Sequence, residues 1–386
     1  MKFETKAIRT QTETTQHREH STPLFPTSSF VFNSAEQMQD LFSGEEKGNI
    51  YSRFSNPSVT EFEDKMAALE GVEKAMAMAT GMAAVYASFM TFLKKGDHLI
   101  ASRAIFGSTF NMLQKRLPDF GIECTFVDPL DMENWGDAVQ ANTKMLYLET
   151  PSNPGLTVID LEAAGHFCKQ HNLIYSVDNC FATPYIQNPA KYGADLVIHS
   201  ATKFIDGQGR VMGGMVGGSA ALIEQVYLFI RSTGASLSPF NAWVLSKSLE
   251  TLAVRMDRHC ENAMKLARAL GEHPNVQKVN YPFLPTHPQY EIAKKQMRHG
   301  GGIVTFELKG NIDDGRKFLN KLKMLSLTAN LGDARSIASH PASTTHLRVP
   351  QEERLLVGIT DTLIRISVGL EHIDDIVADI SQALGD

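Results

Sequence analysis

The stretch that decides the fold is LIYSVDNCFATPYIQNPAKYGADLVIHSATK, residues 173–203. It contains two short apolar runs, Leu173–Val177 and Leu196–Ile198. Polar residues follow each run, with Asp178 directly after the first and Lys203 shortly after the second. Continuous apolar runs of this length are typical of parallel strands that helices cover on both faces. Ligands of such sheets bind beyond the carboxyl ends of the strands, so we expect both polar segments to face one site.

The same pattern continues upstream. Strand-like runs occur at Ala75–Ala79, His98–Ala101, Cys124–Val127 and Met145–Leu148, with amphipathic segments at Thr109–Asp119 and Leu161–His171. Strands that alternate with helices indicate βαβ units. The sequence therefore predicts an α/β fold with a large, mostly parallel sheet.

The pattern changes after Gly218. Long helices are indicated over Ser238–Leu270, strands at Ile303–Glu307 and Leu363–Val368, and a last helix at His372–Leu384. These segments predict a smaller α+β domain. At the other end of the chain, residues 1–60 are rich in polar residues and contain several prolines, which is typical of an extended arm with short helices. We therefore expect an N-terminal arm over 1–55, an α/β domain over 56–250 and a C-terminal α+β domain over 251–386.

Composition excludes several functional classes. The chain has 386 residues, of which 43% are hydrophobic and 21% charged, as in soluble globular proteins. Its net charge of −6 leaves no basic excess for a nucleic-acid partner. The four cysteines are far apart, so we expect no metal site and a reducing, cytoplasmic location. Residues 75–93 carry no charge, but Thr80 and Gly81 interrupt them, so we expect a strand, a turn and a helix rather than a membrane span.

Residues with catalytic chemistry follow four of the predicted strands. They are Gly81 and Met82, Asn153, Asp178, and then Ser200, Thr202 and Lys203. Pyridoxal 5′-phosphate (PLP) needs a lysine for a Schiff base and an acid beside its pyridinium nitrogen. It also needs phosphate donors, which a helix N-terminus supplies through its backbone N–H groups. The sequence therefore favours a PLP site, with Asp178 keeping the ring nitrogen protonated.

Each of these residues also has a structural interpretation. A lysine after a strand is usually a surface residue, and an aspartate there is often a turn residue or a helix cap. A Ser-x-Thr sequence is equally suited to capping a helix. Only the placement of all of them at one edge of the sheet favours the cofactor site.

Two motifs, Asp178–Pro184 and His199–Lys203, resemble the Cys/Met-metabolism family of PLP enzymes. Further similarities are Tyr51–Arg53 with Asn56-Pro57, Ser339–Ala342 and Arg365–Gly369, so that the resemblance covers nearly the whole chain. This family includes cystathionine γ-synthases, methionine γ-lyases and O-acylhomoserine sulfhydrylases. The resemblance implies the type I, aspartate aminotransferase-like fold of PLP-dependent transferases. Three stretches resemble the O-succinylhomoserine sulfhydrylases most: Asp206–Arg210, Leu237–Trp243 and Thr328–Asp333.

The resemblance also implies roles for individual residues. Lys203 would bind the cofactor and move protons, Asp178 would pair with the pyridinium nitrogen, and Arg365 would hold the substrate α-carboxylate. The phosphate would be held by Gly81, Met82, Ser200 and Thr202, and by Tyr51 and Arg53 of a neighbouring subunit. Asn153 would lie near the phenolic oxygen of the cofactor, and Asn330 and Tyr51 near the substrate. The family pattern implies a homodimer with shared active sites, and usually a homotetramer.

Three positions depart from the common family pattern. Phe106 stands where many members have a tyrosine over the cofactor ring, so ring stacking is kept but the hydroxyl is lost. Asn330 stands where several relatives have serine, and it still offers a donor and an acceptor. Cys180 replaces a common threonine, either touching the cofactor or filling space beside Asp178.

Several functions stay open at this point. The first is γ-replacement on O-succinylhomoserine with sulfide, giving homocysteine and succinate for methionine biosynthesis. Close alternatives are O-acetylhomoserine sulfhydrylase and cystathionine γ-synthase, which differ in the acyl group or the sulfur donor. Further alternatives are a methionine γ-lyase, which Phe106 disfavours, and a non-catalytic PLP carrier or interaction protein, which intact Lys203, Asp178 and Arg365 disfavour.

Arg103 and Arg348 are the two candidates for contacting the second carboxylate of a succinyl group, although a surface or structural role suits either.

Overall fold

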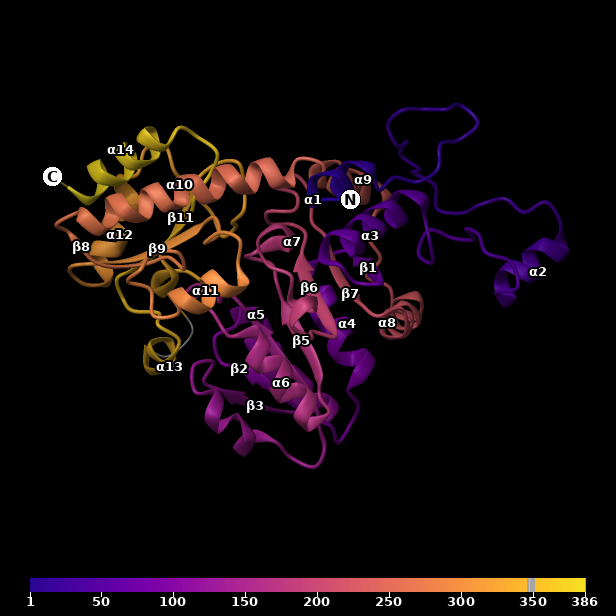
Figure 1. Ribbon diagram of the computed structural model, residues 1–386, viewed down its shortest axis with the longest axis horizontal. Coiled ribbons are helices and arrows are strands. Elements are labelled where there is room, and N and C mark those ends of the chain that lie inside the picture. The colour runs from indigo at the N-terminus through magenta and orange to yellow at the C-terminus, as the bar shows by residue number, and fades with distance from the viewer. Residues whose placement is uncertain (346, 348–350, 386) are drawn as a thin grey trace.

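The larger of two sheets carries the segments that decided the fold. The computed structural model describes residues 1–345, 347 and 351–385, and this sheet has the strand order β1-β7-β6-β5-β4-β2-β3 (Figure 1). The strands are β1 (Lys74–Met78), β2 (His98–Ser102), β3 (Glu123–Val127), β4 (Thr143–Glu149), β5 (Ile174–Asp178), β6 (Leu196–Ser200) and β7 (Gly214–Gly218). β7 runs antiparallel to both neighbours, and the other adjacent pairs are parallel. The predicted fold class is confirmed.

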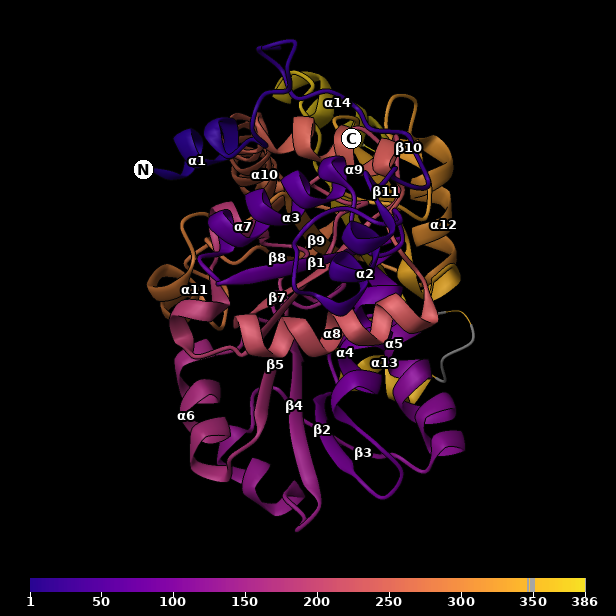
Figure 2. The same ribbon diagram turned by 90° about the vertical axis from the view of Figure 1, so that its right-hand side faces the viewer.

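Helices cover both faces of this sheet. One face is covered by α3 (Pro57–Glu70), α6 (Leu161–His171) and α7 (Thr183–Ile186), and the other by α4 (Gly81–Phe92), α5 (Gly107–Asn111) and α8 (Ala220–Thr233). Within β1, Ala75 and Ala77 pack towards the first set, while Met76 and Met78 pack towards the second. Figure 2 shows α8 lying across the strands, where it contacts α4, β1 and β7. Both faces are therefore buried, as the continuous apolar runs predict.

A second, smaller sheet has the order β10-β11-β12-β9-β8. Its strands are β8 (Val276–Asn280), β9 (Ile303–Leu308), β10 (Ser326–Leu327), β11 (Ile337–Ser339) and β12 (Leu363–Ser367). The helices α10 (Leu252–Glu272), α12 (Ile312–Lys321) and α14 (Ile373–Leu384) pack on it. The same part of the chain also contains α11 (Tyr290–Gln296), which joins the core of the larger domain through Ala293, and α13 (Gln351–Leu356). α9 (Pro239–Leu249) ends just before α10 begins, and the domain boundary at residue 250 stays a prediction.

The N-terminal segment contains two short helices, and its extent as an arm over 1–55 stays a prediction. α1 (Phe3–Arg9) packs on the larger domain, where the Phe3 and Tyr185 rings lie 5.1 Å apart, centroid to centroid. α2 (Ala35–Ser43) extends away from the rest of the chain (Figure 1).

The uncharged residues 75–93 form β1, a turn and α4. None of the described helices is long and apolar enough to span a membrane.

The structure differs from the sequence prediction in one segment near the site. Thr109–Asp119 is not a single helix, because α5 gives way to a π-helical turn over Met112–Arg116 and a 3₁₀ turn over Leu117–Phe120. Pro118 has no N–H to donate and its ring displaces the preceding carbonyl groups, so a regular α-helix cannot continue through it.

A buried charge cluster joins α3 to α9. Lys65 Nζ lies 3.1 Å from Glu61 Oε1, 2.9 Å from Ser246 Oγ and 3.3 Å from Glu250 Oε1. The side chains of Lys65 and Glu61 are 0% and 2% exposed. Each charge is therefore satisfied by partners inside the protein rather than by water.

We predict that Lys65→Met destabilises the protein strongly, because Glu61 is left buried without its cation. Loss of one partner of a buried ion pair costs about 3–5 kcal/mol. The control is Lys265→Met on α10, which breaks a pair to Glu261 of the same i,i+4 spacing at 2.7 Å, with side chains 51% and 53% exposed. That variant is expected to change the free energy of unfolding by about 0.5 kcal/mol or less. Urea unfolding of both variants checks this, and equal losses would contradict it.

Candidate active site

The first turn of α4 meets the end of β6. α4 begins at Gly81 because the Thr80 hydroxyl caps it by accepting a hydrogen bond from the Ala83 N–H at 3.0 Å. The N–H groups of Gly81 and Met82 then have no partner within the helix. A Cβ atom on Gly81 would lie 2.6 Å from Ser200 Cβ, so glycine is required for this approach. The arrangement directs free N–H groups towards the Ser200 side chain and leaves room there for an anion.

A cavity of about 250 Å³ opens at this point. It brings together nine of the predicted site residues: Gly81, Met82, Phe106, Asn153, Asp178, Ser200, Thr202, Lys203 and Arg365. Eight of them lie at or just after the carboxyl ends of five strands of the larger sheet, and Arg365 belongs to β12 of the smaller one. Asn330 adjoins the cavity, since its Oδ1 accepts a hydrogen bond from Lys203 Nζ at 2.7 Å. The carboxyl ends of the parallel strands thus form one site with the C-terminal domain.

Lys203 enters the cavity from the turn that follows β6. Burial lowers the pKa of its ammonium group, because charge is disfavoured away from water. Beside it, Cys180 lines the same cavity, and its Sγ donates to the Ser200 carbonyl at 3.6 Å. Burial raises the pKa of the Cys180 thiol, so it stays protonated at neutral pH. Lys203 is therefore the stronger nucleophile and base of the two.

Asp178 and Glu149 place two carboxyl groups in the same buried region. The Cys180 N–H donates to Asp178 Oδ1 at 2.9 Å, and the Tyr147 hydroxyl donates to Oδ2 at 3.5 Å. Burial raises the pKa of Asp178, and burial together with the Asp178 charge raises that of Glu149. Among the described residues, Asp178 forms no ion pair. A cation bound in the cavity beside Asp178 would relieve this repulsion.

Arg365 is a second cationic side chain that lines the cavity with Lys203. Its Nη1 donates to Asn153 Oδ1 at 2.9 Å and its Nη2 to the Asn330 carbonyl at 3.2 Å. Its Nε is buried and has no hydrogen-bond partner in the described structure. Burial lowers the pKa of the guanidinium to about 10, against the opposing effect of Glu149. The group therefore stays charged at neutral pH, and its Nε–H is free to donate to a ligand.

Two predicted site residues lie elsewhere. Tyr51 and Arg53 line a separate surface cavity of about 250 Å³ with Ser236 and neighbouring residues. The Arg53 Nη1 donates to the Arg231 carbonyl, and Tyr51 is 42% exposed. Within one chain they do not contribute to the cavity around Lys203. The prediction that they complete the site of another subunit stays a prediction.

Sequence reasoning missed Glu149 as a site residue. Its Oε2 accepts a hydrogen bond from the Phe106 N–H at 2.7 Å, which fixes the loop carrying the aromatic ring. The signal was available, because Glu149 directly follows the apolar run Met145–Leu148 as Asp178 follows its own. Other lining residues, such as Leu331 and Thr345, come from C-terminal loops that no local pattern connects to the strands.

These residues fit PLP. The free N–H groups at the start of α4 and the hydroxyls of Ser200 and Thr202 suit a phosphate. Asp178 is a buried carboxyl without an ionic partner in the described structure, as a protonated pyridine ring requires. Lys203 is a buried amine of lowered pKa, suited to a Schiff base.

Comparison with known proteins agrees with this geometry. Residues 4–385 match the family described as Cys/Met metabolism PLP-dependent enzyme. The chain belongs to this family. Its cofactor is PLP, and it is a trans-sulfuration enzyme that acts on an amino-acid substrate. The resemblance noted in the sequence is confirmed.

Individual relatives differ in activity. An O-succinylhomoserine sulfhydrylase of Pseudomonas aeruginosa is 44% identical over 382 residues, which is 99% of this chain and 95% of the relative. An L-methionine gamma-lyase of Fusobacterium nucleatum is 46% identical over 365 residues, covering 94% and 92% of the two chains. A Campylobacter jejuni structure described as an O-acetylhomoserine (thiol)-lyase, with N′-pyridoxyl-lysine-5′-monophosphate, has a TM-score of 0.96 and 33% identity, and the match covers 100% of both chains. The family member therefore has the type I PLP fold, while similarity alone leaves its specificity open.

We predict that Gly81→Ala weakens PLP binding, because the added Cβ displaces Ser200 from the helix start. Loss of one or two charge-assisted hydrogen bonds to the phosphate corresponds to roughly 10- to 100-fold in affinity. The measurement is PLP affinity of apoenzyme by absorbance titration. Gly136→Ala, at a position where a Cβ meets no atom within 4 Å, is the control and should bind PLP as the wild type does.

A buried histidine behind the Lys203 turn predicts acid sensitivity. His259 Nδ1 donates to the Val368 carbonyl at 2.6 Å, and its ring packs edge-on against Phe204 at 5.2 Å between centroids. Burial lowers its pKa to about 4 from the usual 6.5. The unfolded chain therefore binds a proton between these values and the folded chain does not, so folding stability falls as pH drops from 6.5 to 4.

We predict that His259→Gln reduces this acid-induced loss of stability by about 3 kcal/mol. Urea unfolding at pH 7 and pH 4 measures the difference for each variant. His17→Gln, at an exposed position of the arm, should leave the difference as in the wild type. An unchanged pH dependence in His259→Gln would show that the folded protein already accommodates the charged imidazole.

Proposed function

We propose that the protein is an O-succinylhomoserine sulfhydrylase of methionine biosynthesis. In this reaction the Cγ–O bond of O-succinylhomoserine breaks and a Cγ–S bond forms with sulfide, which releases succinate and leaves homocysteine. The observation that carries the proposal is the identity of the aromatic residue at the cavity wall. Phe106 stands there beside Asp178 and Lys203, and its ring has no hydroxyl.

Phe106 matters because leaving groups differ in their need for an acid. A carboxylate leaves unaided, since its conjugate acid has a pKa near 4, whereas a thiolate has one of about 8.5 and benefits from protonation. The described residues of one chain that line the cavity include no tyrosine. This supports succinate as leaving group over the methanethiolate of methionine.

Arg365 is suited to hold the α-carboxylate of the substrate. Its Nε is the buried donor without a partner, and Asn153 and Asn330 fix the other two nitrogens. A carboxylate would gain charge-assisted hydrogen bonds from the planar guanidinium. The substrate amine would then lie on the Lys203 side of the cavity.

Lys203 is suited to move protons at the substrate. Its Nζ has a lowered pKa, so a fraction of the amine is neutral and can accept the Cα proton and later return it. Bound here, the cofactor would supply an electron sink for the charge that develops at the substrate Cα. Asp178 would hold a proton on the ring nitrogen, and Phe106 would cover the ring and exclude water.

A second copy of the chain is the proposed partner. A larger cavity of about 1110 Å³ adjoins the catalytic one, and both are lined by Met82, Phe106, Ala329 and Thr345. The arm that carries Tyr51 and Arg53 reaches away from its own site, and Val31 within it is 98% exposed. These features support a homodimer in which each arm supplies phosphate contacts to the other site. Further assembly into a homotetramer rests on the family resemblance alone.

Methionine γ-lyase is the second candidate, since the relative from F. nucleatum is as similar as the sulfhydrylase. The two functions differ in product. A lyase converts the substrate to 2-oxobutanoate whether or not sulfide is present, whereas a sulfhydrylase needs sulfide to form homocysteine.

We predict that holoenzyme with O-succinylhomoserine and sulfide forms homocysteine as its main product. Little 2-oxobutanoate is expected from this substrate, and less from methionine. Both products are quantified together, with and without sulfide. Lys203→Ala should abolish both reactions while leaving the folded chain intact by circular dichroism. Predominant 2-oxobutanoate from either substrate, independent of sulfide, would favour the lyase.

A further inference from the structure

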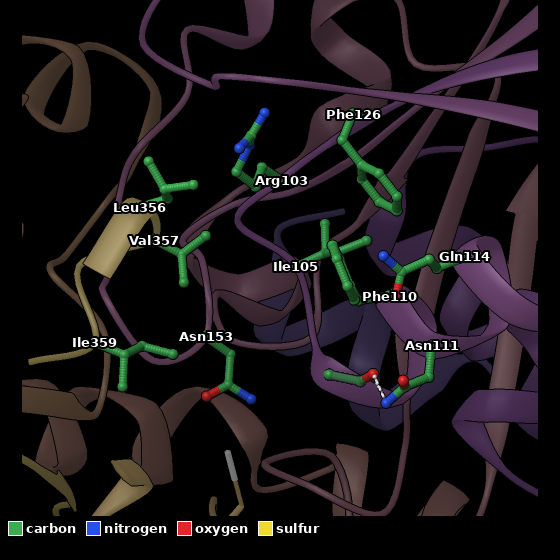
Figure 3. Close-up of a pocket in the computed structure, with 11 residues that line it drawn as sticks. Arg103, Ile105, Phe110, Asn111, Gln114, Phe126, Asn153, Leu356, Val357 and Ile359 are labelled. Carbon is green, nitrogen blue, oxygen red and sulfur yellow. Dashed lines mark hydrogen bonds between the residues drawn. The ribbon is translucent and has the colours of Figure 1, made fainter. Parts of the chain in front are cut away.

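A second cavity lies beside the catalytic one and has no role in the steps above. Its volume is about 300 Å³, and Asn153 lines both cavities. Most of its wall is apolar, formed by Ile105, Phe110, Phe126, Leu356, Val357 and Ile359. Figure 3 shows Asn153 at one end of this cavity and Arg103 at the other, with apolar side chains along both sides. An elongated ligand with an apolar middle would fit between these two polar ends.

Arg103 is the charged group of this cavity. It follows β2 directly, and its N–H donates to the Val127 carbonyl at 2.9 Å, which fixes its backbone to the neighbouring strand. Its Nε is buried without a hydrogen-bond partner, and the side chain makes no ion pair within the part of the chain that the structure describes. Arg103 as a whole is half-buried, so its guanidinium is accessible from the cavity, and a bound carboxylate would gain charge-assisted hydrogen bonds from it. The other candidate for this role, Arg348, lies outside the described residues.

We propose that Arg103 binds the terminal carboxylate of the O-succinyl group and thereby selects this ester. The inference rests on the proposed function. Arg365 would hold the α-carboxylate, and its contact to Asn153 places the substrate next to the second cavity. The succinyl chain would pass Asn153 and lay its two methylene groups along Ile105 and Val357. An acetyl group has no second carboxylate, so it would leave Arg103 unpaired.

The experiment compares kcat/KM for O-succinylhomoserine and O-acetylhomoserine in four holoenzymes. These are the wild type, Arg103→Gln, Arg103→Lys, and Arg316→Gln, whose exposed arginine on α12 pairs with Asp313. Arg103→Gln should lower kcat/KM for the succinyl ester about 10- to 100-fold, mainly through KM, since one charge-assisted contact is lost. Its kcat/KM for the acetyl ester should change about two-fold or less, as expected for a group that this ester does not contact. Arg103→Lys should be intermediate because it keeps the charge but not the fork.

A direct binding measurement separates this inference from the proposed function. Calorimetric titration of the holoenzyme with succinate should show binding that Arg103→Gln weakens and Arg316→Gln does not. If the wild type makes no homocysteine from either ester, the proposed function fails, and succinate binding still decides whether Arg103 holds a dicarboxylate. An equal fall for both esters in Arg103→Gln, or unchanged succinate affinity, would overturn the assignment.

Discussion

The site depends on the close approach of the first turn of α4 to the ends of β6 and β7. Two glycines make it possible. A Cβ on Gly81 would collide with Ser200, and one on Gly214 would lie 2.8 Å from the Gly81 nitrogen and closer still to the Thr80 carbonyl. Because β7 can sit against the helix start, the free N–H groups of α4 point at the same place as the residues that follow β6. A strand with larger side chains there would separate the phosphate donors from Lys203.

Around this anchor the protein balances several buried charges against one another. Burial raises the pKa of Asp178, and burial together with the Asp178 charge raises the pKa of Glu149. Burial lowers the pKa of the two cations, Lys203 and Arg365. Buried charges are retained where partners compensate them. In the described structure the protein offers Asp178 no ion pair and leaves the Arg365 Nε without an acceptor. On the proposed assignment, cofactor and substrate would supply these two missing partners.

The sequence predicted the parallel strands and the residues that follow them, because apolar runs and the polar residues at their ends are local signals. β7 was missed, since Gly214–Gly218 has few side chains and forms a strand only by pairing with β1 and β6. The break at Pro118 was missed because an amphipathic pattern does not reveal a change of helix type. Glu149 was missed although it directly follows the apolar run Met145–Leu148, so its local signal was present. The second cavity was missed for a different reason, because it depends on which loops meet in space, and Asn153, Arg103 and Val357 come from three distant segments.

The two arginines assigned to the substrate stand on different domains. Arg365 belongs to β12 of the smaller sheet, and Arg103 follows β2 of the larger one, with Asn153 after β4 between them. A substrate with carboxylates at both ends would therefore connect the two domains through charge-assisted hydrogen bonds, whereas an ester with one carboxylate would contact a single arginine. On the proposed assignment, specificity for the acyl group would depend on the relative position of the sheets, while the chemistry at Cγ would depend on Lys203 and Phe106 within the first cavity. Different residues would then set these two properties, so that relatives sharing a catalytic lysine site could differ in the substrate that they select.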